Sequence, residues 1–204
     1  MVTLDTQCHP AKIVSMMEKK SLRERKKERT RKALIDSATS LFLDKGFDNT
    51  TVDEIADAVD VSRRTFFRYF KIKEAVVFTN HEMRVGIFKK LLEENRDVSD
   101  PMSGVKRAFV GLAAAYSEMS ESLRNEWAIV TASPILIAKD VELDFEYESA
   151  IADYLMQQSG AELLDCKIRA GALFGAIRVV MQEWFSNDCK QDLEKLGERA
   201  LALF

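Results

Sequence analysis

Residues 29–74 of this chain read RTRKALIDSATSLFLDKGFDNTTVDEIADAVDVSRRTFFRYFKIKE, and this stretch decides the fold. Its first segment places four apolar side chains on one face at helical spacing: Leu34, Ala38, Leu41 and Phe42. Gly46 then supplies the left-handed residue that ends a helix. Thr51, followed three residues later by Glu54, is a capping box that begins a second helix of barely two turns. The pattern predicts two helices joined by a tight turn.

A third helix is predicted from Ser62, which can cap the segment RRTFFRYF at residues 63–70. Phe66 and Phe70 lie four residues apart on one face, where they can anchor the helix to a core. Arginines at positions 63, 64 and 68 occupy the other faces. Arginine makes bidentate hydrogen bonds to guanine in the major groove and also binds phosphates. The three segments together predict a helix-turn-helix that reads DNA.

Two motifs give this stretch a family resemblance: GF-x-x-TTV-x-x-IA from residue 46 and VS-x-x-T-x-F-x-YF-x-x-KE from residue 61. They resemble the N-terminal domain of TetR-family transcriptional regulators. The resemblance implies an all-α fold, with an N-terminal three-helix helix-turn-helix DNA-binding domain and a C-terminal helical ligand-binding and dimerisation domain. It implies that the DNA-binding residues are Thr51, Tyr69 and Lys73 at phosphates, Arg63, Arg64, Thr65 and Phe67 near bases, and the helix cap Ser62.

Three positions depart from the family pattern. Asp60 stands where the turn usually carries Gly, but Asp tolerates a left-handed backbone better than most residues. Arg64 also replaces a common Gly, and its long charged side chain implies a different operator preference. Phe67 replaces a frequent Tyr, which removes a hydroxyl and leaves an apolar edge for a thymine methyl.

Charge is distributed unevenly along the chain. Residues 1–80 contain 16 Lys or Arg against 12 Asp or Glu, whereas residues 81–204 contain 14 against 21. The net charges are therefore +4 and −7, which places a DNA-facing end at the N-terminal side. Residues 19–32 hold nine basic side chains, and this arm could lie along phosphates or enter a minor groove. The alternative is that the arm is only a solvated lead into the first helix.

The length of 204 residues is enough for two small domains. We expect a disordered leader at 1–20, the DNA-binding domain with its basic arm at 21–74, and the effector-binding and dimerisation domain at 75–204. A helix opening at Lys73 and running toward Leu92 is the expected link between the domains. Pro101, Pro134 and other breaks predict five further helices, near 101–118, 121–132, 134–158, 161–186 and 189–203.

Gly171 and Gly175 are costly inside a helix, and they lie four residues apart on one face. Something must approach this face closely. We expect a helix of a partner subunit in a homodimer, with Leu193 and Leu196 of the final helix completing the dimer interface; close packing within the same subunit is the alternative.

A ligand pocket is expected among C-terminal aromatic and polar side chains, although aromatics at helical spacing are also typical of a simple core. The candidates are Phe109, Tyr116, Trp127, Tyr147, Phe174, Arg178 and Met181. The effector is an unidentified small molecule, expected to be largely apolar with one or two polar groups. The alternating acids from Asp140 to Glu148 are expected to face solvent, with a cation-binding rim as the alternative.

No residues predict catalysis, a metal site or a cofactor, because no Ser-His-Asp, Walker or dinucleotide pattern surrounds either histidine. Three scattered cysteines without metal-ligand spacing are typical of reduced cytosolic thiols, and redox sensing through Cys166 and Cys189 is an alternative. No signal peptide or membrane anchor is recognisable. We therefore expect a cytoplasmic, homodimeric transcriptional regulator, a repressor that binds double-stranded palindromic operator DNA and is released by a small molecule. The alternative is a helical DNA-binding architectural or interaction protein without an effector.

Overall fold

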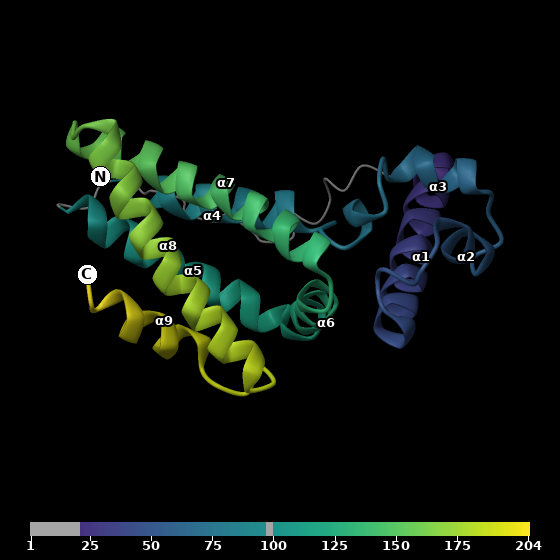
Figure 1. Ribbon diagram of the computed structural model, residues 1–204. Helices are drawn as coiled ribbons and strands as arrows, with labels where there is room; N and C mark the ends of the chain where they lie inside the picture. Colours follow the sequence, from purple (N-terminus) through teal and green to yellow (C-terminus); the bar gives the residue numbers. More distant parts are fainter. Residues whose placement is uncertain (1–20, 97–99) are drawn as a thin grey trace, which may run out of the picture.

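The computed structural model describes residues 21–96 and 100–204, and within these ranges it consists of helices joined by loops and turns, without a strand. The expected leader at 1–20 lies outside the described residues. The elements are α1 (Leu22–Lys45), α2 (Val52–Asp57), α3 (Arg63–Tyr69), the 3-10 turn η3 (Glu74–Val76), α4 (His81–Glu94), α5 (Pro101–Glu118), α6 (Ser120–Thr131), α7 (Pro134–Ser159), α8 (Leu163–Ser186) and α9 (Leu193–Leu201). The all-α prediction is confirmed. Figure 1 shows α1, α2 and α3 grouped at one end and the helices α4 to α9 packed together at the other.

The helix-turn-helix forms through the predicted caps. Thr51 accepts a hydrogen bond from the Glu54 amide, and the Glu54 carboxylate accepts one from the Thr51 amide, as a capping box requires. Ser62 caps α3 by accepting from the Thr65 amide at 3.2 Å. Asp60 adopts a φ of +54°, so it takes the left-handed turn conformation expected of it.

The N-terminal apolar cluster extends beyond residue 74. Leu34, Phe42, Ile55 and Phe66 are its buried centre, and the cluster also includes buried residues from η3, α6 and α7: Val76, Val77, Phe78, Ile129, Val130 and Leu136. The DNA-binding end and the C-terminal helices therefore share one core, and the packing gives no clean boundary at residue 74.

The link between the two ends is not the continuous helix expected from Lys73. The chain forms only the short turn η3 there, and α4 begins at His81. The physical reason is that Val76, Val77 and Phe78 are all buried in the N-terminal cluster. Helix α4 packs in the other cluster, through Val85 and Phe88, so the helix is interrupted where the chain passes from one core to the other.

The basic arm is also different from the expectation. Its residues from Leu22 to Lys32 are the first turns of α1, which starts with a capping box between Ser21 and Glu24. A segment that is part of a long α-helix cannot thread a minor groove as an extended arm, so that prediction is wrong for the described part. The arm is an exposed, basic helix surface instead.

Two C-terminal helices begin later than the sequence predicted. Helix α8 begins at Leu163 rather than 161, because Gly160 at a φ of +64° ends α7 just before. Helix α9 begins at Leu193 rather than 189, since Asp188 and Cys189 both have positive φ and cannot belong to a helix. The predictions for α5, α6 and α7 agree with the structure to within one residue.

Candidate DNA-binding surface and ligand pocket

Helix α3 carries the predicted DNA-reading side chains. Phe66 is fully buried and Phe70 is nearly so, which fixes the helix on α1 and α2. Arg64, Phe67 and Arg68 are exposed on the outer surface. This geometry leaves a cationic, partly aromatic helix face free for a major groove.

The other residues of α3 that were predicted to contact DNA make interactions within the protein. The guanidinium of Arg63 donates to the Asp53 carboxylate at 2.7 Å and lies over the Phe67 ring. Thr65 is half-buried, and its hydroxyl lies 3.0 Å from that of Ser62. Tyr69 is half-buried with the Arg68 guanidinium above its ring. Of these contacts only the Arg63–Asp53 ion pair joins α3 to α2; the others lie within α3 and its cap.

Lys73 has a structural role that sequence reasoning missed. Its ammonium group donates to the carbonyl oxygens of Phe47 at 2.8 Å and Thr50 at 2.9 Å, and it lies 4.0 Å from the centre of the Phe47 ring. These contacts tie the end of α3 to the loop before α2. A phosphate contact by Lys73 stays a prediction.

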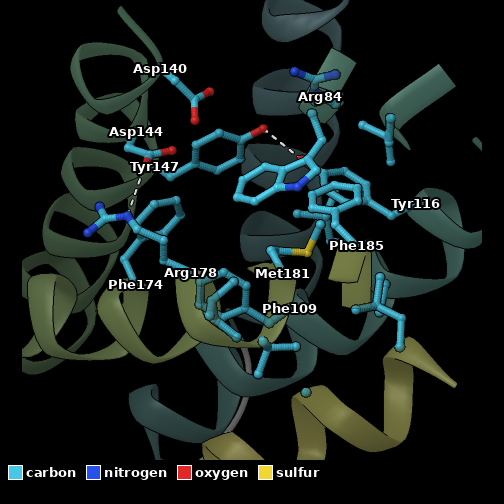
Figure 2. A pocket seen from close by; sticks show the side chains of 18 of the residues that line it. Arg84, Phe109, Tyr116, Asp140, Asp144, Tyr147, Phe174, Arg178, Met181 and Phe185 are labelled. Atoms are coloured by element: carbon cyan, nitrogen blue, oxygen red, sulfur yellow. Dashed lines mark hydrogen bonds and ion pairs between the residues drawn. The ribbon is translucent and has the colours of Figure 1, made fainter. Parts of the chain in front are cut away.

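The C-terminal helices enclose a cavity of about 150 Å³. All seven side chains predicted for a ligand pocket lie around it: Phe109, Tyr116, Trp127, Tyr147, Phe174, Arg178 and Met181. Figure 2 shows these aromatic side chains converging from different helices. The hydroxyls of Tyr116 and Tyr147 lie 3.1 Å apart, and Trp127 stacks on Phe185 with ring centres 4.8 Å apart. The structure thus brings the seven together, although they are spread over four helices.

Charged side chains also line the cavity, and sequence reasoning missed most of them. Arg84, only 7% exposed, donates to both carboxylate oxygens of Glu126, one of them at 2.8 Å. Burial works to lower the pKa of Arg84, but the hydrogen-bonded Glu126 carboxylate raises it overall. No signal in the sequence distinguishes this pair from ordinary solvated charges, because its members lie 42 residues apart.

The acidic run does not simply face solvent as expected. Glu142 and Glu146 are exposed, but Asp140 and Asp144 line the cavity. Asp144 accepts a hydrogen bond from Arg178 at 3.1 Å, and burial raises its pKa despite that partner. Among residues 21–96 and 100–204 no three His, Cys, Asp or Glu side chains are arranged to hold a metal ion, so a cation-binding rim finds no support there.

Comparisons with known proteins agree with this geometry. Residues 34–78 match the family model for bacterial regulatory proteins of the tetR family, and residues 99–204 match that for the MftR C-terminal domain. The HTH-type transcriptional regulator TcmR of Streptomyces glaucescens is 35% identical over 189 residues, which cover 86% of this chain and 81% of that protein. The chain belongs to the TetR family. It is therefore a DNA-binding transcriptional regulator.

Two solved TetR-like structures share the fold at low identity. The complex of SmeT with triclosan aligns with a TM-score of 0.63 at 22% identity, covering 86% of this chain and 89% of SmeT. The Thermus thermophilus TetR-family repressor FadR in complex with lauroyl-CoA aligns with a TM-score of 0.60 at 23% identity, covering 85% and 92%. In each of these two structures a small molecule is bound to a protein of this fold.

The expected dimer residues of this TetR-family chain divide into two groups. Apart from the adjacent residues and the backbone of α8 itself, no atom of residues 21–96 and 100–204 lies within 4 Å of the position that a Cβ would take at Gly175, and only a Glu148 oxygen does so at Gly171, at 3.9 Å. Close packing within the subunit therefore does not explain the glycines. By contrast, Leu193 is only 4% exposed and belongs to an apolar cluster of its own subunit with Trp184, so little of its side chain is available to a partner; Leu196 is half-buried against the same cluster. Their place in a dimer interface stays a prediction.

Two further observations bear on the alternatives. Cys166 and Cys189 belong to different apolar clusters, which argues against a redox pair. In the part of the chain that the structure describes, no helix has the length and apolar character needed to span a bilayer.

Proposed function

We propose that this TetR-family regulator is a homodimeric repressor that binds a palindromic operator and releases it when a small molecule occupies the cavity among α4 to α9. The protein acts on cytoplasmic DNA and has no catalytic role. The observation that carries the proposal is the position of α6. Trp127 and Glu126 of this helix line the cavity, while Ile129 on the same helix packs into the core of the DNA-binding end.

Helix α4 provides a second connection. Its first residue, His81, and its buried Arg84 line the cavity, and the preceding residues Val77 and Phe78 are part of the N-terminal cluster. A ligand that moves α4 or α6 therefore also moves groups that pack against α1. Because Arg84 and Glu126 join these two helices, they are expected to move together.

The dimer is proposed to form through the outer face of α8. Leu164, Ile168 and Val179 on this helix are between 60% and 66% exposed, a large apolar exposure for one soluble helix. The absence of neighbouring atoms at Gly175 would let a partner helix approach closely. A two-fold dimer places two α3 helices on half-sites about one helical turn of DNA apart, or slightly more, which is why the operator should be palindromic.

Switching requires a ligand with different affinities for the two conformations. A molecule that binds the DNA-free conformation about a hundredfold more tightly weakens operator binding by the same factor, or roughly 2.7 kcal/mol, at each equivalent site. The cavity of about 150 Å³ suits a small, mostly apolar group, and larger effectors require the side chains to rearrange.

The test combines two titrations on the full chain. An operator is first selected from random duplex DNA, and its binding is followed by fluorescence anisotropy. Triclosan, lauroyl-CoA and a set of small aromatic compounds are then added, with binding measured by calorimetry. The proposal expects operator release over the concentration range in which a compound binds. Arg64→Ala serves as the control that keeps ligand binding but loses operator affinity. Compounds that bind without changing operator affinity would favour a DNA binder without an effector.

A further inference from the structure

The charges around the cavity do not cancel. Five ionised side chains line it: the guanidinium groups of Arg84 and Arg178 and the carboxylates of Glu126, Asp140 and Asp144. Glu126 pairs with Arg84, and Asp144 pairs with Arg178. Asp140 has no hydrogen bond or ion pair with another described residue, so one negative charge is left without a partner at the cavity wall.

Asp140 is held in a poor environment for a carboxylate. Figure 2 shows it on α7, above Asp144 and beside the ring of Tyr147. Burial, followed by the nearby charges of Asp144 and Glu126, raises the pKa of Asp140 to about 6. At neutral pH the group is therefore mostly ionised, partly desolvated and without a counter-charge, an environment that favours a cationic ligand.

The rest of the lining suits the same kind of molecule. Aromatic rings surround the cavity, with Trp127 stacked on Phe185 and Tyr147 stacked on Phe174 at 5.4 Å between ring centres. The faces of such rings attract cations and stack on flat aromatic ligands. The two arginines do not oppose this, because Arg84 pairs with Glu126, and Arg178 pairs with both Asp144 and Glu148.

His81 is a second polar group left without a partner. It is 6% exposed, it lines the cavity, and its buried Nε2 makes no hydrogen bond, although a Glu146 carboxylate oxygen lies 3.4 Å away. Burial lowers the pKa of His81, so the imidazole is neutral at pH 7 and adds no positive charge. When the imidazole carries its proton on Nδ1, Nε2 can accept a hydrogen bond from an N–H group of a ligand.

We infer that the effector of this cavity is an organic cation with a flat aromatic ring system, whose positive charge is bound by Asp140 and whose rings lie among the aromatic side chains. This inference rests on the proposed function, because it assumes that the cavity is the effector site, and it names the chemical class that the site selects.

The experiment uses three bicyclic probes of nearly equal size with the full chain at pH 8: the permanent cation N-methylquinolinium, neutral quinoline, and the anion 1-naphthoate. Binding is measured by calorimetry. The cation is expected to bind at least about tenfold more tightly than quinoline, since a charge-assisted contact in a partly desolvated site exceeds a neutral one by about this factor. 1-Naphthoate should bind most weakly. Equal binding of cation and neutral probe, a preference for the anion, or no binding of the cation would each overturn the inference.

Variants assign the preference to one side chain. Asp140→Asn should reduce the affinity for N-methylquinolinium about tenfold and leave that for quinoline unchanged. Asp140→Glu retains the charge and should restore much of the preference. The matched control is Glu142→Gln, two residues further on the same helix but exposed and outside the cavity. An Asp140→Asn protein that keeps the full preference for the cation would contradict the assignment.

Operator anisotropy in the same titrations separates the two proposals. If N-methylquinolinium binds through Asp140 but does not release the operator, the switching function fails while the ligand class stands. If quinoline or 1-naphthoate releases the operator more effectively than the cation, the switching function stands and the ligand class fails.

Discussion

Removing Glu126 should destabilise this protein far more than removing an ordinary surface acid. The side chain of Arg84 is 8% exposed and that of Glu126 is 14% exposed, and two hydrogen bonds join them. In Glu126→Ala, the Arg84 guanidinium stays buried without a counter-charge. Breaking a buried ion pair by deleting one partner costs about 3–5 kcal/mol, a large fraction of the total stability of a typical domain.

The measurement is urea unfolding at pH 7.5, followed by circular dichroism, with Glu121→Ala as the control. Glu121 is an exposed acid on the same helix, and its replacement should change the free energy of unfolding by less than about 0.5 kcal/mol. The double variant Arg84→Met/Glu126→Leu replaces the pair with apolar side chains of similar length. It should recover most of the stability lost in Glu126→Ala, because no unpaired charge then remains.

Two results would refute this reasoning. A loss below about 1 kcal/mol for Glu126→Ala would show that water reaches Arg84 easily, so that the pair behaves like a surface contact. A double variant less stable than Glu126→Ala would show that packing around the pair, rather than its charges, determines the cost.

Four other expectations follow from the structure. Arg64→Ala should weaken operator binding by about 1–3 kcal/mol but hardly affect random duplex; equal losses in anisotropy on both would show that Arg64 touches only phosphate. Lys73→Met should lower the free energy of unfolding in urea by about 1–2 kcal/mol, because two carbonyl oxygens lose their donor; an unchanged unfolding midpoint would show that water replaces it. Gly175→Leu should leave the helical circular dichroism spectrum intact, since no described atom outside the local backbone of α8 lies within 4 Å of a Cβ there, while sedimentation shows dissociation of the dimer; a dimer of normal stability would disprove the interface. The folded-state pKa of Asp140 is raised from 3.8 to about 6, so the stability that depends on its protonation is fully present below pH 3.8 and is lost as the pH rises through 6. The free energy of unfolding of Asp140→Asn, measured in urea, should therefore exceed that of the wild type by at most about 3 kcal/mol at pH 8 and equal it at pH 3.5.

The local sequence determined the DNA-binding end of this protein. The capping box at Thr51, the cap at Ser62 and the left-handed turn at Asp60 are interactions between residues only a few positions apart, so their spacing alone specifies them. The anchoring role of Phe66 and the exposure of Arg64 follow from helical periodicity in the same way. Composition also predicted the aromatic lining of the cavity, because large apolar side chains in helical domains are placed on inward faces.

Contacts distant in sequence were decided only by the tertiary structure. Three features depend on how the helices cross: the burial of Arg84 against Glu126, the unpaired state of Asp140 and the burial of Leu193 in its own subunit. The sequence of one helix does not reveal which side chains the neighbouring helix places against it. The break before His81 has the same origin. The apolar residues from Val76 to Phe78 are compatible with a helix or a turn locally, and the break forms because they pack in the N-terminal core whereas α4 packs in the C-terminal one.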